Sequence, residues 1–390
     1  MHDDGFQNKF QVRVVDSSIN YWVVRAGEDA AYLSHFKYNN LVAIGHLDKM
    51  DFLPSDLEDR KQLLKLLSKY QKQLLDEKSS KASATNKSGQ VYRFVTEMKI
   101  GDVIISLDEK SILTGVITSH AYKDNRQKVI RSKEGAVVGS PLTYSLRRNV
   151  SWGNPVSRNA APAAVRSSLR ANQAVFCVSE HWQTLNHWLS VIFTKDDAVY
   201  FSSKIMQTQQ ISNFDVSQFS RILNIFEAVA SELAYSLKNN VHNDLIYFSD
   251  LYGSAELKEF IDNAYETCLR DREFQLKTQQ SFMSPGDYWG SLTGDKVKNV
   301  IFIMAFCTLF NCEAVFADGM DMDIAITNKD AIDTLVEHIK EKEGFDYVEK
   351  GLKIKLPRPH QLSDSDNSSD TAPEDVLKFP TDEASDTGEI

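Results

Sequence analysis

Three aspartates near the C-terminal end of the chain have the side chains and the spacing to hold a metal ion. Asp318, Asp321 and Asp323 follow an apolar run at 314–317 that is typical of a buried strand. Carboxylates in this position are ligands for Mg²⁺, which polarises a phosphate and generates a nucleophile for phosphodiester hydrolysis. An acidic loop with a structural or partner-facing role has the same pattern, so both interpretations stay open.

Motifs of other enzyme classes are missing from the sequence. It has no Walker loop, no G-x-S-x-G and no HExxH motif. Its three candidate histidine ligands, His181, His187 and His242, have no cysteine or second acidic partner at ligand spacing. No two cysteines form a CxxC pair, which indicates reduced, mostly buried thiols in a cytoplasmic protein. The four cysteines are Cys177, Cys268, Cys307 and Cys312.

Aromatic residues interleaved with arginines in the first half of the chain suit a different chemistry, the stacking of an extruded base. Trp22, Tyr144 and Trp152 are the candidates for the stacking wall. Stacking on an aromatic ring is worth roughly 1 to 3 kcal/mol per base, which helps to offset base extrusion. A tryptophan on a strand, however, is more often part of the core.

Polar contacts to the same ligand are predicted at two places. Arg25 ends a strand and offers a forked donor to a phosphate or a base edge, although a salt bridge at the strand end is equally consistent. Gly27 permits a close approach of the backbone. Tyr92 and Arg93 lie on a predicted helix at 90–98, where the alternative for Arg93 is a surface ion pair.

The net charge of −10 hides a strong division along the chain. Residues 361–390 hold nine acidic residues against one lysine, so the remaining body is close to neutral. Residues 119–170 hold ten basic residues against two acidic ones, as expected of a surface that binds a phosphate backbone. A solvated loop region that happens to be basic is the alternative. The candidate phosphate contacts here are Arg126, Lys128, Arg131, Arg147 and Arg148.

The apolar patterns predict an α+β fold with two domains. An extension at 1–18 precedes a first domain at 19–180, with strands at 21–27, 41–45, 102–107, 112–118 and 144–153. An amphipathic helix at 56–78 and a flexible loop at 78–89 lie between the second and third strands. We expect a barrel with flanking helices.

The second domain is predicted at 187–355, with a hairpin at 188–205 and a loop at 281–295 that could shape a site. A buried helix at 296–310 is too short to cross a bilayer, and no secretory signal is recognised. Residues 356–390 have the composition of a disordered acidic tail.

The strand order and the residues on these strands resemble a known family. The pattern WVVRAG, VAIG, polar helix, YRFVTEMKIGD, LTGVI and RRNVSW is similar to the N-terminal domain of Mrr-type and related modification-dependent restriction proteins, a relative of the EVE and YTH domains with a PUA-like barrel. The resemblance covers about residues 19–180. Its most specific residues are Trp22, Arg25, Gly27, Arg93, Glu97, Met98, Gly101, Asp102, Arg148 and Trp152.

This resemblance implies that the first domain recognises a modified nucleotide, with a flipped base in DNA favoured over RNA, in a restriction or anti-phage defence system. Better-known members carry a nuclease domain of the PD-(D/E)xK kind after the reader. Here no strand with Glu-x-Lys or Gln-x-Lys follows Ile326, so we expect no nuclease in the isolated chain. Mg²⁺ is a cofactor only if the nuclease alternative holds. The third interpretation is an interaction protein that recruits a separate effector through its second domain.

Overall fold

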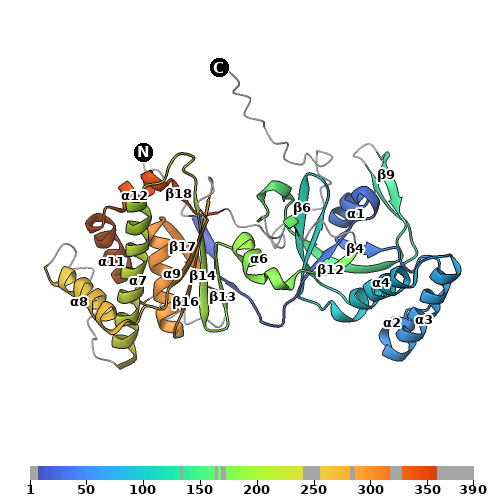
Figure 1. Cartoon of the computed structure of the whole chain (residues 1–390), viewed down its shortest axis with the longest axis horizontal. Helices are drawn as coiled ribbons and strands as arrows, with labels where there is room; N and C mark the ends of the chain where they lie inside the picture. Colours follow the sequence, from blue (N-terminus) through green and yellow to red (C-terminus); the bar gives the residue numbers. More distant parts are fainter. Residues whose placement is uncertain are drawn as a thin grey trace, which may run out of the picture. The chain divides into compact units, whose positions relative to one another are not determined.

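The structure is a computed structural model that describes residues 8–131, 135–162, 166–167, 173–239, 255–281, 286–316 and 327–357 (Figure 1). These residues form two compact units, one of residues 18–185 and one of residues 8–17 with 186–357. Each unit has a hydrophobic core of its own. The predicted α+β class is confirmed. The predicted tail lies outside the described residues from position 358 onward.

A curled half-barrel sheet forms the centre of the unit of residues 18–185. Its strand order is β12–β3–β5–β6–β10–β4. The strands are β3 (Tyr21–Val24), β4 (Leu41–Ile44), β5 (Val103–Leu107), β6 (Ser111–Ile117), β10 (Leu146–Trp152) and β12 (Val175–Cys177). β3 and β5 run parallel, and the other neighbours are antiparallel. β4 and β5 are buried along their whole length, which explains why all their residues except Ser106 are apolar.

Short strands extend this sheet at its margins. β7 (Tyr122–Lys123) pairs with β10, and β11 (Val156–Ser157) pairs with β6. β8 (Lys128–Arg131) and β9 (Val137–Leu142) form a separate antiparallel ribbon.

The helices of this unit differ from the prediction in two respects. They are η1 (Glu28–Ala30), α1 (Leu33–Tyr38), α2 (Ser55–Glu58), α3 (Arg60–Asp76), α4 (Lys81–Tyr92), the π-helical η2 (Arg93–Glu97), η3 (Arg158–Ala160) and η4 (Ser179–His181). The predicted helix at 56–78 is divided at Asp59, whose carboxylate caps α3 by accepting from the Lys61 and Gln62 backbone N–H groups. The loop predicted at 78–89 is wrong, because most of it forms α4.

Small residues explain why this polar segment is helical. Ser80 caps α4, and the buried Ala84 and Ser88 let the helix pack closely on α3, where Gln71 donates a hydrogen bond to the Ser88 hydroxyl. Packing of one helix face supplies the stability that intrinsic propensity lacks.

The unit of residues 8–17 and 186–357 has a second sheet with the order β15–β16–β14–β13–β2. Its strands are β2 (Arg13–Val14), β13 (Ile192–Lys195), β14 (Ala198–Ile205), β15 (Lys277–Ser281), β16 (Gly286–Thr293) and β18 (Ile354–Lys355), which pairs with β14. β1 (Asn8–Gln11) pairs in parallel with β17 (Cys312–Val315). The N-terminal residues 8–17 therefore belong to the unit formed by the second half of the chain.

Helices cover one face of this sheet (Figure 1). They are α7 (Asn213–Asn239), α8 (Ala255–Asp271), α9 (Lys296–Leu309), α11 (Lys329–Lys342) and α12 (Phe345–Leu352), and α6 (Trp182–Leu189) crosses the sequence boundary between the units. α9 is almost wholly buried, and its Phe302 and Phe306 rings pack on Phe201 of β14. Across the described ranges no helix is long and apolar enough to cross a membrane.

The loop predicted at 281–295 is also corrected, since residues 286–293 form β16. Tyr288, Gly290 and Leu292 alternate toward the core along this strand. A Cβ atom at Gly290 would lie 2.0 Å from the Phe201 ring, so the glycine makes room for an aromatic neighbour rather than for a turn.

Candidate functional site

A pocket of about 630 Å³ opens in the unit of residues 18–185, where the end of β3 meets the tip of the β5–β6 hairpin. It lies at the first predicted contact, the segment that contains Arg25 and Gly27. The pocket is lined by Arg25, Ala26, Gly27, Asp29, Ala30, Leu107, Asp108, Glu109, Lys110 and Arg158. Its volume falls within the range of small-ligand sites, about 300 to 1,000 Å³.

The wall that follows β3 has an unusual backbone. Gly27 has φ +86°, and a Cβ atom there would lie 2.9 Å from Tyr32 Cδ2. Asp29 and Ala30 follow with φ values of 48° and 57°, in a region that residues with a Cβ atom rarely occupy. Consecutive residues in this region are strained, and such strain concentrates at functional sites. The backbone is therefore bent sharply around the pocket.

The opposite wall is held rigidly by one carboxylate. Asp108 Oδ1 accepts hydrogen bonds from the Lys110 and Ser111 backbone N–H groups at 2.7 and 2.6 Å and from the Ser111 hydroxyl at 2.9 Å. Arg158 Nη1 donates to the Asp108 carbonyl oxygen at 3.0 Å. These hydrogen bonds fix the hairpin tip and Arg158 relative to each other. Asp108 Oδ1 stabilises the turn by accepting all three hydrogen bonds from Lys110 and Ser111.

Two guanidinium groups meet at this pocket. Burial and the nearby charge of Arg158 lower the pKa of Arg25. Lys110 adds a third cation to the lining, and Asp29 and Glu109 add exposed carboxylates. Guanidinium forks match the geometry of phosphate and carboxylate groups, while carboxylates accept hydrogen bonds from amino groups. The lining can therefore bind a ligand that carries both an anionic group and hydrogen-bond donors.

A family model matches this part of the chain. Residues 22–167 match a domain of unknown function, DUF8426. No curated protein and no solved structure matches the chain. The DUF8426 region contains the pocket and most of the half-barrel sheet.

An aromatic pair in the DUF8426 region lies beside the pocket. The Tyr32 and Tyr144 rings meet edge to face, with centroids 4.8 Å apart. A Cβ atom at Gly27 would lie 3.4 Å from the Tyr144 hydroxyl, and one at Gly45 would lie 2.5 Å from the Tyr144 ring. Gly45 thus makes room for the half-buried Tyr144, while Gly27 makes room for Tyr32. Burial raises the pKa of Tyr144, so its hydroxyl stays protonated at neutral pH.

The two tryptophans predicted to stack on a base lie in the core instead. Trp22 and Trp152 are only 3% and 2% exposed. Trp22 Nε1 donates to Asp102 Oδ2 at 2.8 Å, and the Trp152 ring packs on Gly115 of β6. Of the predicted stacking wall only Tyr144 is partly exposed, so the predicted wall does not fit where these side chains lie.

Arg148 is fully buried and holds backbone together. Its guanidinium donates to four carbonyl oxygens, those of Phe94, Val95, Met98 and Ser119, at 2.7 to 3.0 Å. Three of these carbonyls lie in or next to η2, whose end would otherwise leave them without donors. Burial lowers the pKa of Arg148 to about 10, so the group stays charged at neutral pH.

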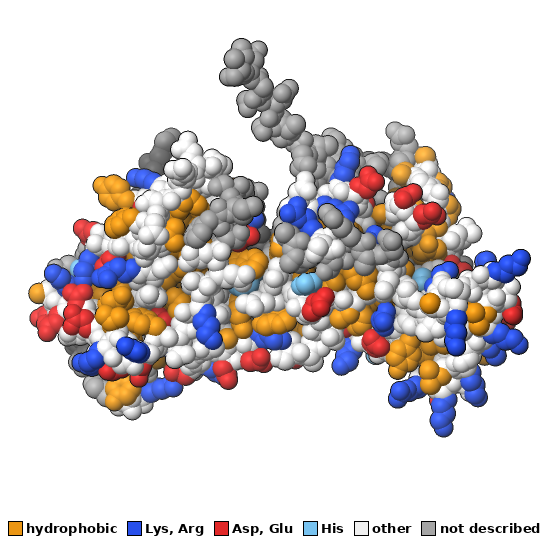
Figure 2. All heavy atoms as spheres, viewed as in Figure 1, with side chains coloured by type: hydrophobic (Ala, Val, Ile, Leu, Met, Phe, Trp, Pro, Cys, Tyr) orange, Lys and Arg blue, Asp and Glu red, His pale blue; other side chains and the backbone are white. Residues whose placement is uncertain are grey.

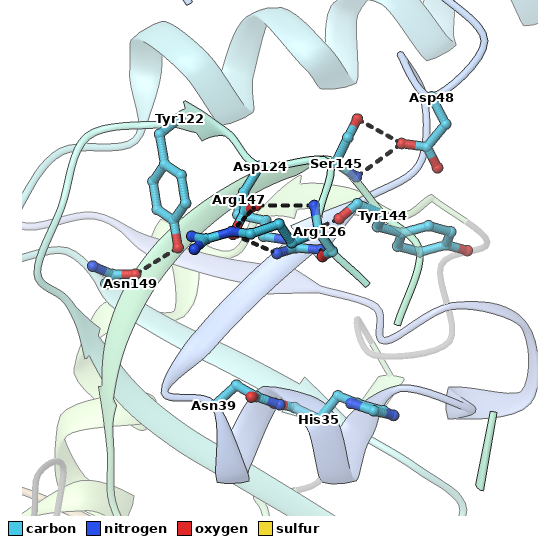
Figure 3. A network of polar contacts seen from close by, with 10 residues as sticks. All are labelled: His35, Asn39, Asp48, Tyr122, Asp124, Arg126, Tyr144, Ser145, Arg147 and Asn149. Atoms are coloured by element: carbon cyan, nitrogen blue, oxygen red, sulfur yellow. Dashed lines mark hydrogen bonds and ion pairs between the residues drawn. The ribbon is translucent and has the colours of Figure 1, made fainter. Parts of the chain in front are cut away.

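Arg147 is also fully buried, in the network of Figure 3. Its Nη1 lies 2.9 Å from Asp124 Oδ2, and its other nitrogens donate to the Tyr144 and Arg126 carbonyl oxygens. The exposed Arg126 donates two hydrogen bonds to the same carboxylate, at 2.9 and 3.1 Å. The hydrogen bond from Arg126 is the main reason that the pKa of Asp124 is lowered to about 2.

The remaining predicted contacts lie away from the pocket lining. Arg93 is half-buried, and its Nη1 lies 3.5 Å from Gln173 Oε1. Tyr92 is half-buried at the end of α4, while Lys128 and Arg131 lie on β8, where Arg131 donates to the Gly135 carbonyl. Of the twelve predicted contacts, the pocket lining includes Arg25 and Gly27, and Tyr144 lies next to it.

The predicted carboxylate cluster Asp318, Asp321 and Asp323 lies outside the described residues. Within the described part of the chain no group of three or more His, Cys, Asp and Glu residues is placed to hold a metal ion. The functional interpretation therefore rests on the pocket of the DUF8426 region.

Proposed function

We propose that residues 18–185 bind nucleic acid and hold one extruded nucleotide in the pocket between Arg25, Gly27 and Arg158. The two arginines would bind the nucleotide's phosphate, and the carboxylates of Asp29 and Glu109 would accept hydrogen bonds from base amino groups. Tyr144, beside Gly27, would contact the base or sugar at the rim.

The pairing of Arg25 and Arg158 is the observation that carries this proposal. Arg25, Lys110 and Arg158 all line the pocket, and burial together with the nearby charge of Arg158 lowers the pKa of Arg25. Cationic side chains gathered in a concave site attract an anionic ligand. The forked guanidinium side chains are suited to a phosphate group. A pocket of about 630 Å³ has room for one nucleotide but not for a duplex.

The choice of a modified base as the ligand is supported by the resemblance to EVE and PUA-like readers, which rests on the YWVVRAGE and MKIGD segments. YWVVRAGE contains β3 and runs directly into the pocket, and MKIGD leads into β5, the parallel neighbour of β3. We further propose that the full chain acts in restriction-type defence, with the second unit as an effector or partner-binding module.

Fluorescence anisotropy with matched duplexes tests the reader function. The full chain would be titrated against duplexes containing cytosine, methylcytosine, hydroxymethylcytosine, glucosylated hydroxymethylcytosine or methyladenine at one position. We expect tighter binding of one modified duplex, and we expect Arg25→Ala with Arg158→Ala to reduce that preference at least tenfold. Arg270→Ala, an exposed arginine of the other unit, is the matched control. Equal binding of all duplexes by the parent chain would contradict the proposal.

Gly27→Ala separates pocket shape from charge in the same assay. An added methyl group meets the Tyr32 ring at 2.9 Å and strains a backbone with φ +86°. We expect this variant to lose the preference while keeping the salt-dependent affinity for unmodified DNA. Parent-like discrimination by Gly27→Ala would show that the ligand binds elsewhere.

A further inference from the structure

We propose that one face of α3 binds the phosphate backbone of a nucleic acid through a row of four lysines, Lys61, Lys65, Lys69 and Lys72, here called the α3 lysine row. This inference builds on the proposed nucleic-acid function and assigns it a second contact surface away from the pocket. It involves none of the twelve contacts predicted from the sequence.

Helical geometry places these lysines in one line. Their spacing of four, four and three residues keeps them within about 80° of arc at 100° per residue, over a length of about 16 Å at 1.5 Å per residue. All four are exposed. The opposite face of α3 is buried in the core by Leu63, Leu66, Leu67, Tyr70 and Leu74. The row is thus fixed in direction by packing on the other side of the helix.

The charges of the row are not balanced within the protein. From Arg60 to Leu75 the helix has five basic residues and no acidic one, with Asp76 as the first. Within the part of the chain that the structure describes, none of the four lysines forms an ion pair with a carboxylate. Like charges three or four residues apart destabilise a helix, and an external polyanion would remove that repulsion. Figure 2 shows the blue side chains gathered over α3, at the lower right of the view.

α11 shows what a solvated helix of similar amphipathic pattern looks like. Between Lys329 and Lys342 the helix carries both acidic and basic residues, and Lys340 Nζ lies 2.8 Å from Glu337 Oε1. A mixed surface of this kind neutralises itself. The α3 lysine row has the opposite design, with one sign of charge along one face.

A few polar contacts connect the end of α3 with the segment that contains Tyr144. Lys49 Nζ lies 3.7 Å from Glu77 Oε1, just after α3 ends. The adjacent Asp48 accepts two hydrogen bonds from Ser145, which follows Tyr144 at the pocket rim. α3 and the pocket therefore belong to one compact unit, and a bound nucleic acid could contact both.

A nucleic acid fits the row better than a membrane surface does. The lysines at i, i+4 and i+8 rise about 6 Å per step, which suits a linear series of phosphates. The row contains no tryptophan or phenylalanine of the kind that anchors an interfacial helix, although Leu64 and Leu75 on one flank are each 46% exposed.

The test compares two charge-matched variants of the full chain. One is Lys61→Gln with Lys65→Gln, Lys69→Gln and Lys72→Gln. The control is Lys258→Gln with Lys277→Gln, Lys296→Gln and Lys350→Gln, which removes four exposed lysines from the other unit. Affinity for an unmodified and a modified duplex is measured by anisotropy from 50 to 300 mM NaCl, with a thermal melt of each variant and the single variant Lys65→Gln as a milder probe.

We expect the row variant to weaken binding of both duplexes by the same factor, about tenfold or more at 100 mM NaCl. The slope of log K against log [NaCl] should fall by up to about 3.6, which is 0.9 for each lost phosphate contact. The control should keep the parent slope, and Lys65→Gln should lower it by about 1. Equal slopes for the row variant and the control overturn the inference.

Failure of this inference and failure of the reader function look different. If the row variant binds like the control, while the variant with Arg25→Ala and Arg158→Ala loses discrimination between duplexes, only the α3 contact is contradicted. If the parent chain binds modified and unmodified duplexes equally, and its affinity still depends on the α3 lysine row, only the proposed reader function is contradicted. Loss of binding to vesicles of phosphatidylserine and phosphatidylcholine, with unchanged DNA affinity, would overturn the α3 contact in favour of a membrane surface.

Discussion

The two units of this chain place their buried charges in contrasting ways. In residues 18–185, the arginines Arg147 and Arg148 are fully buried and donate mainly to backbone carbonyls. In the unit of residues 8–17 and 186–357, one buried ion pair joins Lys298 of α9 to Glu227 of α7 at 2.9 Å. The first arrangement holds irregular loops around a curled sheet, and the second locks helices to each other. Because Arg147 and Arg148 are buried, the number of basic residues in a segment of the sequence overestimates the basic charge at its surface.

The largest effect is expected where a buried cation has four acceptors. Arg148→Ala leaves the carbonyls of Phe94, Val95, Met98 and Ser119 without this donor, and unsatisfied buried groups cost about 1 to 3 kcal/mol each before relaxation and entry of water. We expect the free energy of unfolding of this unit to fall by about 3 to 4 kcal/mol in urea denaturation. Arg131→Ala, an exposed arginine with one carbonyl partner, should change it by less than 1 kcal/mol, roughly. Similar losses for both would show that Arg148 has no special structural role.

A smaller effect is expected for the ion pair of the other unit. Glu227 accepts from the Gln275 and Leu276 backbone N–H groups as well as from Lys298, so Glu227→Gln leaves a buried ammonium without its counter-charge. We expect a loss of about 2 to 3 kcal/mol in the same denaturation experiment. Glu337→Gln breaks an exposed Glu–Lys pair of nearly equal length and should cost less than about 1 kcal/mol. Equal effects of the two substitutions would contradict a distinction based on burial.

Acid should affect the second unit through His187. Its ring stacks on Trp289, and burial lowers its pKa to about 3 from 6.5. Between these values the unfolded chain binds a proton that the folded chain does not, so stability should fall as the pH drops below about 6.5. His187→Phe keeps an aromatic ring and removes the titration. We expect a flatter melting temperature between pH 6.5 and 4 in this variant than in the parent, and identical pH profiles would contradict the assignment.

Much of the fold of residues 18–185 could be predicted, because short apolar runs in the sequence indicate buried strands. The runs at 41–45, 102–107 and 112–118 correspond to β4, β5 and β6, because strands that are buried along most of their length consist mainly of apolar residues. α4 could not be predicted in this way. Its small polar residues form a helix because they pack closely on α3, and that contact depends on tertiary structure.

Only one wall of the pocket could be predicted from the sequence, because the other wall is brought to it by strand pairing between distant segments. Arg25 and Gly27 follow β3, but the hairpin tip that faces them is placed by the parallel pairing of β3 with β5, some 80 residues later. No local pattern indicates that Lys110 and Arg158 lie beside Arg25. The sequence also does not show which arginine side chains of β10 are exposed. Consecutive residues on a strand face opposite sides, so one of Arg147 and Arg148 would be expected at the surface. Arg147 and Arg148 are nevertheless both buried, one under the loop of Asp124 and Arg126 and the other against η2.

Hydrogen exchange of the full chain, followed by mass spectrometry with and without the preferred modified duplex, tests the central claim most directly. We predict that amides in residues 25–32 and 107–111 become protected on binding, and that Gly27→Ala abolishes this protection while leaving any protection along α3 in place. Protection confined to other segments, with no change at the pocket, would contradict the account.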